Sequence, residues 1–286
     1  MRMTSVAIRH AKGATPLVML TAYDTPTARI ADGAGADIIL VGDSLAMVVL
    51  GQPDTLGVDV AVMAHHVAAV SRANALALVV ADMPWLSYHT SAGEAVANAG
   101  ILIRAGAEAV KVEGATPARL EVIAALLDAQ IPVMGHIGLT PQSRHVMGGY
   151  SVQGRGHDEA KLVIAAAVAL DQAGCFALVV ECTPQCLTAA ITDSVAIPVI
   201  GIGAGGDCDG QVLVLHDLLG LTEGPAPRFV RRYANLKVDA VAAAARFADD
   251  VRARRYPSEE ESYGEAPAPT ASPEEYQQDP AANRDR

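Results

Sequence analysis

The chain has 286 residues, of which 51% are hydrophobic and 19% are charged, and its formal net charge at pH 7 is -11. This acidity argues against a nucleic-acid-binding role, because binding to phosphates needs a basic face and none is evident. No apolar run reaches the roughly 18 residues of a membrane span, and the N-terminus is too polar for a signal peptide, so no membrane association is expected and the cytoplasm is the expected location.

Short apolar runs predict eight strands, and most of the segments between them have helical patterning. In chain order the expected strands are 17–22, 38–41, 78–81, 109–112, 133–135, 178–180, 198–202 and 212–215. The expected helices are 26–34, 60–73, 92–105, 117–129, 158–173 and 184–193. Eight β/α units predict a closed barrel in one domain, residues 1–263, since such barrels use roughly 250 residues.

A doubly wound open sheet is the alternative fold. It is disfavoured because no GxGxxG motif follows the first expected strand. The glycine-rich segment 201–206 follows the seventh expected strand instead. There, glycines suit a close approach to a substrate or phosphate, but they suit a tight turn equally well.

The last part of the chain has a different composition. From Pro257 to Arg286 it contains eight acidic residues and two arginines, a net charge of -6, with five prolines and no aliphatic residue larger than alanine. Such a segment cannot bury enough surface to offset its ordering entropy. We therefore expect residues 264–286 to form a disordered acidic tail. The four cysteines form no CxxC pair and are expected to be buried free thiols.

Five of the apolar runs are followed by, or end on, a side chain that can hold a metal or move a proton. These side chains are Asp43, Asp82, Glu113, His136 and Glu181. The carboxyl ends of parallel strands meet at one edge of a sheet or barrel, where active sites form. The sequence therefore predicts an enzyme.

Three of these carboxylates, Asp43, Asp82 and Glu113, follow neighbouring strands and are expected to reach one point. Hard oxygen ligands suit Mg²⁺ better than Zn²⁺. Taken singly, each has the alternative role of a helix cap or an ion pair. Together they favour a cation, because three converging negative charges would otherwise repel one another.

Glu181 is expected outside that cluster, as a general base. Its apolar neighbours would partly desolvate it, which favours proton uptake, although a structural ion pair is the alternative role. Lys111 lies two residues before Glu113, so strand alternation places both side chains on the same face, and Lys111 is expected to pair with a carboxylate or carbonyl oxygen of the substrate. His136 is a further candidate for substrate contact, or else a hydrogen-bonding partner of a site residue.

Several stretches, in order along the chain, resemble the ketopantoate hydroxymethyltransferase family. They are Leu20–Asp24, Val41–Leu45, Ala81–Pro84, Val110–Gly114, Gly135–Ser143, Gly148–Tyr150, Val152–Gly156, Val180–Cys182, Pro198–Gly205 and Asp209–Gln211. The likeness runs from about residue 5 to about residue 263. One segment, the loop 51–57, departs from the pattern. Pro53 and Gly57 change the backbone conformations that this loop can adopt, so its geometry over the substrate is left open.

The resemblance implies a (β/α)8 TIM barrel of the phosphoenolpyruvate/pyruvate superfamily. It implies an enzyme of pantothenate biosynthesis that transfers a hydroxymethyl group from 5,10-methylenetetrahydrofolate to 3-methyl-2-oxobutanoate, giving 2-dehydropantoate and tetrahydrofolate. Family members are homo-oligomers, often decamers. The roles that it implies are Mg²⁺ ligation by Asp43, Asp82 and Glu113, contact with the oxo acid by Asp43, Ser44, Asp82 and Lys111, and proton acceptance by Glu181.

Two other functions are weighed against this one. A carbon–carbon lyase of the same superfamily, of the 2-methylisocitrate lyase type, would rely on a cysteine-bearing catalytic loop, and no matching loop is found in the sequence. A catalytically inactive barrel kept for assembly or regulation is disfavoured because every expected site position is intact. A folate-dependent turnover assay separates these possibilities.

Overall fold

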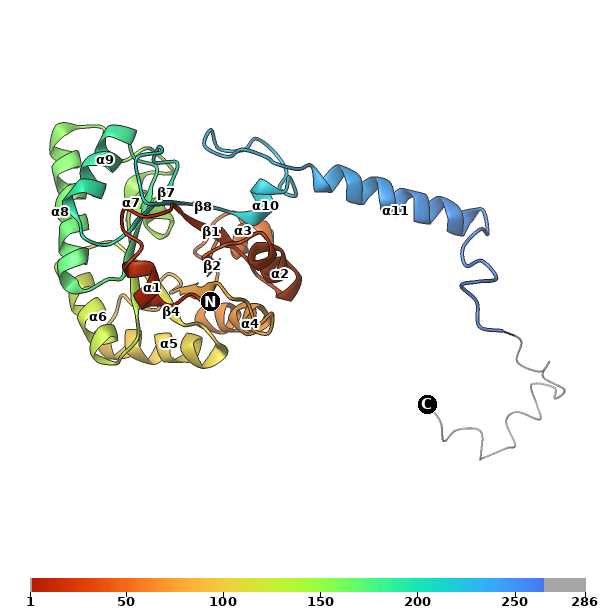
Figure 1. Ribbon diagram of the computed structural model, residues 1–286, viewed down its shortest axis with the longest axis horizontal. Helices are drawn as coiled ribbons and strands as arrows, with labels where there is room; N and C mark the ends of the chain where they lie inside the picture. The colour runs from red at the N-terminus through yellow and green to blue at the C-terminus, as the bar shows by residue number, and fades with distance from the viewer. Residues whose placement is uncertain (1, 265–286) are drawn as a thin grey trace, which may run out of the picture. The chain divides into compact units, whose positions relative to one another are not determined.

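Eight parallel strands close into a barrel in sequence order in a computed structural model, which describes residues 2–264 (Figure 1). The strands are β1 (Leu17–Thr21), β2 (Ile38–Val41), β3 (Leu78–Asp82), β4 (Ala109–Glu113), β5 (Val133–Gly138), β6 (Ala177–Glu181), β7 (Val199–Ile202) and β8 (Gly210–Leu213). Pairing of β1 with β8 closes the ring. The predicted (β/α)8 barrel is confirmed, and the open sheet is excluded.

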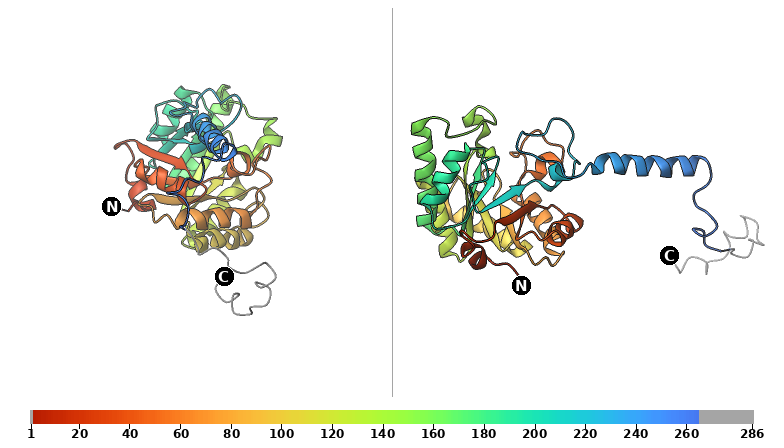
Figure 2. Two further views of the ribbon diagram at one scale, coloured as in Figure 1. Left: turned by 90° about the vertical axis from the view of Figure 1, so that its right-hand side faces the viewer. Right: turned by 45° about the horizontal axis from the view of Figure 1, so that its top comes forward.

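Within residues 2–235, six helices of eight residues or more surround the strands of the barrel (Figures 1 and 2). They are α2 (Thr25–Gly33), α4 (Val60–Ser71), α5 (Ala92–Ala105), α6 (Pro117–Asp128), α8 (His157–Ala173) and α9 (Gln185–Ser194). Shorter helices are α1 (Ser5–Arg9), α3 (Leu45–Val48), η1 (Pro141–Ser143), α7 (Arg144–Met147) and α10 (Leu215–Leu218). The six longer helices match the predicted ones within two residues at each end.

Local sequence signals account for most helix boundaries. Asp24, Asp59, Ser91 and Thr116 each cap a helix by accepting a hydrogen bond from a backbone N–H of the first turn. At the other end, Gly106 stops α5 in a left-handed conformation, with a φ of 114°. A side chain at this position would also collide with Ser71, because an added Cβ would lie 2.5 Å from its side chain.

The last strand begins two residues earlier than predicted. Asp209-Gly210 resembles a turn in the sequence, but β8 starts at Gly210, where the backbone passes so close to β1 that an added Cβ would lie 2.6 Å from the carbonyl oxygen of Leu17. Val214 and Leu215, assigned to the strand in the prediction, are instead the N-cap and the first residue of α10. The glycine is needed here for close strand packing rather than for a bend.

The apolar core has two layers. An outer layer fills the space between the strands and the surrounding helices. An inner layer fills the barrel itself and includes Met19, Leu40, Met134 and Ile200. Ile8 of α1 belongs to this inner layer and is fully buried, so the short N-terminal helix closes the end of the barrel where the strands begin. No prediction had placed a helix there.

The chain divides between Asn235 and Leu236 into two compact units, and the barrel is the first. The second begins with α11 (Leu236–Arg252), which has no buried residue. Within it, the rings of Phe247 and Tyr256 lie 5.1 Å apart. The predicted domain end at 263 stays a prediction, and so does the tail, which apart from Gly264 lies outside the described residues.

Two smaller expectations can also be compared with residues 2–264. All four cysteines are free, but only Cys175 is buried, whereas Cys186 is exposed in the first turn of α9. The prediction of buried thiols was therefore wrong for three of the four. Among the helices of the described chain, none combines the length and the apolar character needed to cross a membrane.

Candidate active site

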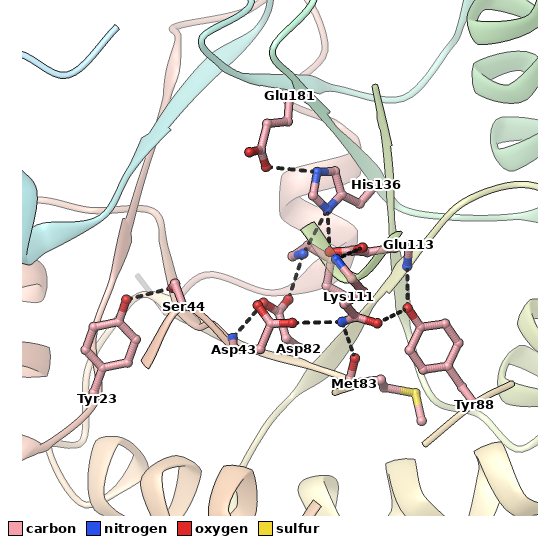
Figure 3. A network of polar contacts seen from close by, with 11 residues as sticks. Tyr23, Asp43, Ser44, Asp82, Met83, Tyr88, Lys111, Glu113, His136 and Glu181 are labelled. Carbon is pink, nitrogen blue, oxygen red and sulfur yellow. Dashed lines mark hydrogen bonds and ion pairs between the residues drawn. The ribbon is translucent and has the colours of Figure 1, made fainter. Parts of the chain in front are cut away.

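All the predicted site residues line one pocket of about 500 Å³ at the carboxyl ends of the strands. They are Asp43, Ser44, Asp82, Lys111, Glu113, His136 and Glu181. The strand register explains why they meet: Asp82 is aligned with Lys111, and Glu113 is aligned with His136. Their side chains face one another across neighbouring strands (Figure 3).

Lys111 is the positive centre of the pocket. Its Nζ lies 2.8 Å from Asp82 Oδ1 and 3.1 Å from His136 Nδ1. Burial by itself lowers the pKa of Lys111, but the surrounding carboxylates outweigh it and raise the pKa above its ordinary value. Lys111 is therefore a fixed cation, available to an anionic substrate.

The carboxylates of Asp43, Asp82 and Glu113 lie close together, so their negative charges repel one another. Burial, followed by the charges of Asp82 and Glu113, raises the pKa of Asp43 well above its usual range. Glu113 behaves differently: burial opposes its charge, but its contacts with His136, Lys111 and the backbone of Gln142 hold its pKa below the ordinary value. An added cation would relieve the repulsion that Asp43 experiences.

Among residues 2–264, no group of three or more His, Cys, Asp or Glu side chains is already arranged to hold a metal ion. Asp43 Oδ2 accepts a hydrogen bond from Gln142 Nε2 at 2.8 Å, and Glu113 Oε2 accepts one from the backbone N–H of Gln142 at 3.1 Å. Asp82 Oδ1 is buried without an aligned hydrogen-bond donor, although Lys111 is close. The oxygen-rich donor set fits Mg²⁺, and the three-carboxylate centre stays a prediction.

Glu181 was expected to stand apart from the acidic cluster, but a histidine links the two. His136 Nε2 lies 3.2 Å from Glu181 Oε2, and His136 Nδ1 lies 3.4 Å from Glu113 Oε1. Burial and Lys111 lower the pKa of His136, but its contacts with Glu113 and Glu181 outweigh them and raise it. His136 therefore stands between Glu113 and Glu181, at ion-pair distance from Glu181 but without an aligned hydrogen bond from Nε2.

The sequence analysis missed two residues that tie the strand ends together. Gln142 is buried, and its Nε2 donates to Asp43 Oδ2 and, at 2.9 Å, to the carbonyl of Met83. Its Oε1 accepts a 2.6 Å hydrogen bond from the Tyr88 hydroxyl, which itself accepts from the backbone N–H of Glu113 at 3.3 Å. Burial raises the pKa of Tyr88 well above its ordinary value, so its hydroxyl keeps the proton that it donates.

This chain of donors fixes the orientation of the Gln142 amide. The carbonyl oxygen of Met83 can only accept, so the amide must direct Nε2 at it and at Asp43, which leaves Oε1 to accept from the Tyr88 hydroxyl. Gln142 lies within a stretch that carried the family resemblance, but nothing local in the sequence indicates these partners. Ser44 is held in a similar way by the Tyr23 hydroxyl, 2.8 Å from its Oγ.

The loop 51–57, whose geometry the sequence left open, does border the pocket. Thr55 lines it and is buried. Asp54 in this loop forms an ion pair of 2.6 Å with Arg144 of α7. The absent side chain at Gly57 makes room for Gln52, since an added Cβ would overlap the side-chain amide oxygen of Gln52.

The family model and the similar proteins all belong to one enzyme family. Residues 2–259 match the family described as ketopantoate hydroxymethyltransferase. A protein of Nitratidesulfovibrio vulgaris (strain DP4) named 3-methyl-2-oxobutanoate hydroxymethyltransferase is 53% identical over 263 residues, or 92% of this chain and 85% of that protein. One of the same name from Moorella thermoacetica is 54% identical over 86% of this chain and 92% of its own length.

Among solved structures, 2,3-dimethylmalate lyase, a member of the PEP mutase/isocitrate lyase superfamily, is similar with a TM-score of 0.58 and 17% sequence identity. The similarity covers 92% of this chain and 89% of that one. At this level of identity the likeness is one of fold, and it agrees with the barrel architecture predicted from the sequence.

Proposed function

Because the chain belongs to the ketopantoate hydroxymethyltransferase family, we propose that its barrel pocket joins a one-carbon unit from 5,10-methylenetetrahydrofolate to 3-methyl-2-oxobutanoate, with Glu181 as proton acceptor. Its identity of more than 50% to relatives of that name identifies the chain as a 3-methyl-2-oxobutanoate hydroxymethyltransferase. The reaction is a step of pantothenate biosynthesis. The roles of individual residues and of Mg²⁺ are our proposal.

The observation that carries this assignment is the placement of a buried cation and a carboxylate base in one pocket, joined through a histidine. Lys111 Nζ lies 3.1 Å from His136 Nδ1, and the other ring nitrogen of His136 lies 3.2 Å from Glu181. Removing a proton from C3 of an oxo acid needs a base on one side and a positive charge near the keto oxygen on the other. The pocket supplies both.

The reaction can be followed through the residues present. Lys111 binds the oxo acid through an oxygen, and Ser44 is positioned beside it by Tyr23. Glu181 takes the C3 proton, and the electron pair of the broken C–H bond moves into the enolate, whose negative charge Lys111 stabilises. The enolate carbon then forms the new C–C bond to the one-carbon unit, and water supplies the oxygen of the hydroxymethyl group. Both C–N bonds between that unit and the folate break, and tetrahydrofolate leaves. Its two nitrogens gain one proton from C3, by way of Glu181, and one from the water.

A divalent ion fits the donor set described above. Asp43, Asp82 and Glu113 would hold Mg²⁺, which would supply Lewis-acid stabilisation of the negative charge on the oxo acid. Gln142 and Tyr88 would position two of these carboxylates. The resemblance also supports a homo-oligomer, with a decamer as the specific form and the cytoplasm as its location; light scattering on the purified chain measures the oligomer.

The test is exchange of the C3 proton of 3-methyl-2-oxobutanoate into heavy water, followed by NMR. This half-reaction needs no folate and isolates the step given to Glu181. Glu181→Gln keeps the size of the side chain but cannot accept a proton, so exchange should fall by roughly 10²- to 10⁴-fold while the oxo acid still binds. Glu121→Gln, an exposed change on α6, is the matched control and should exchange at the wild-type rate. Exchange by Glu181→Gln at the wild-type rate would show that Glu181 is not the base and make His136 the next candidate.

A further inference from the structure

The pocket is larger than the oxo acid alone requires. Pockets of about 300–1,000 Å³ typically enclose drug-sized ligands, and this one measures about 500 Å³. The charged side chains described above come from the ends of β2 to β6, at the inner end of the pocket. A small branched acid bound to them leaves the outer part of the pocket free.

The outer part is apolar and open to solvent. Met47, Tyr150 and Val152 line the pocket, yet they remain 42%, 49% and 37% exposed. Apolar side chains gathered around a concave opening mark a binding surface, because their burial by a ligand is favourable. Such walls suit a flat, largely apolar ring system rather than another small anion.

The aromatic side chain of Phe229 extends this apolar surface toward Glu181, the proposed base. Phe229 lines the pocket and packs over the backbone of Gly203, where an added Cβ would lie 2.7 Å from the Phe229 ring and 3.2 Å from Cys182 Sγ. Cys182 directly follows Glu181. A ring system packed on Phe229 would therefore have one end beside Glu181, where the new C–C bond must form.

The segment that bears Phe229 is held in place and also bears a positive charge. A hydrogen bond of 2.9 Å from Val230 N–H to the carbonyl of Pro227 closes a turn, and one of 2.8 Å from Tyr233 N–H to Leu218 anchors the segment to the barrel. Arg228 lies within this turn, is exposed, and lines the pocket. Its positive charge, unlike the carboxylates that line the pocket, can pair with an anionic group of a ligand.

We propose that this mouth is the binding site of the second substrate, the reduced folate. Its pteridine ring system packs against Phe229 and Tyr150, and its glutamate carboxylates face Arg228. The inference rests on the proposed function, and it assigns to that reaction a folate site built by residues other than the metal carboxylates and Glu181.

Direct binding of tetrahydrofolate, measured by calorimetry without turnover, tests the site. Arg228→Gln should raise the Kd for tetrahydrofolate by about 3- to 10-fold, the contribution expected of a partly exposed charge. Arg231→Gln is the matched control: it removes an arginine three residues along the same segment, one that stacks on Tyr233 instead of lining the pocket. Phe229→Leu should weaken tetrahydrofolate binding by about 10-fold through loss of aromatic contact.

The C3 exchange assay separates this site from the catalytic groups. Since folate is absent from that assay, Arg228→Gln should exchange at the wild-type rate, and its KM should rise for methylenetetrahydrofolate but not for the oxo acid. An unchanged Kd in Arg228→Gln, or an equal change in Arg231→Gln, would overturn the proposal. A wild-type protein that binds tetrahydrofolate but does not exchange the C3 proton would refute the role of Glu181 and leave the folate site supported.

Discussion

Replacing Gln142 by leucine should weaken metal binding without removing any of the proposed ligands. The side chain makes three buried hydrogen bonds: two donated by Nε2, to Asp43 and to the carbonyl of Met83, and one accepted from Tyr88. Leucine makes none of them, while the backbone N–H of residue 142 keeps its bond to Glu113. Loss of such a partner to a ligating carboxylate typically costs about 10- to 100-fold in metal affinity, which is the size of effect we expect.

Tyr88→Phe provides a graded comparison. It removes only the hydroxyl, so Gln142 Oε1 and the backbone N–H of Glu113 each lose one partner. A buried polar group left unpaired costs about 1–3 kcal/mol. Because the carboxylates keep their direct contacts, part of that cost should appear as lower stability, and the loss of metal affinity should be smaller than for Gln142→Leu.

Titration with Mn²⁺, followed by electron paramagnetic resonance in the absence of substrate, measures metal affinity without relying on turnover. Circular dichroism of the same samples confirms that the barrel is folded. A folded Gln142→Leu protein that binds Mn²⁺ as tightly as the wild type would refute the positioning role. So would a loss of turnover at saturating metal that equals the loss at limiting metal.

Three further predictions follow from other parts of the molecule. Asp82→Asn should weaken metal binding, because it removes a charge and the ion pair to Lys111. Activity should recover in part at high Mg²⁺. A Mg²⁺ titration that shows no such recovery contradicts ligation by Asp82. Ile8→Ala should lower the free energy of unfolding by about 2–5 kcal/mol in urea denaturation, since Ile8 is fully buried, and a loss below about 1 kcal/mol would show that α1 does not close the barrel. Deleting residues 265–286 should leave activity and Tm nearly unchanged, because the sequence there has no aliphatic residue larger than alanine; a large fall in Tm would show that the segment contributes to the fold.

The barrel could be predicted from the sequence because its strands are buried on both faces. Segments 38–41 and 78–81 are continuous apolar runs. Gly42 and Asp43 follow the first and Asp82 follows the second, so the strand ends and the candidate site emerge together. The position of Lys111 beside Glu113 followed from strand alternation, and both do line the pocket.

What the sequence did not reveal depends on contacts between segments far apart in the chain. Gln142 lies 99 residues from Asp43, and their hydrogen bond exists only once the barrel has closed. The link from His136 to both Glu113 and Glu181 depends in the same way on the register of β4, β5 and β6. The five-residue α1 lacks the length for a periodic signal, and the start of β8 at Gly210 was missed because its close contact with Leu17 is tertiary.

The end of the barrel where the strands begin is closed, so residues that stabilise the fold there are separate from residues that line the pocket. Ile8 fills the interior where the strands begin, and Asp209 binds the N-terminal segment there through the Lys12 ammonium and the backbone N–H of Gly13. None of these residues lines the pocket. A protein engineer can therefore raise the heat resistance of the enzyme by improving this end, while altered substrate preference should come from substitutions at the opposite rim, such as at Met47 or Phe229.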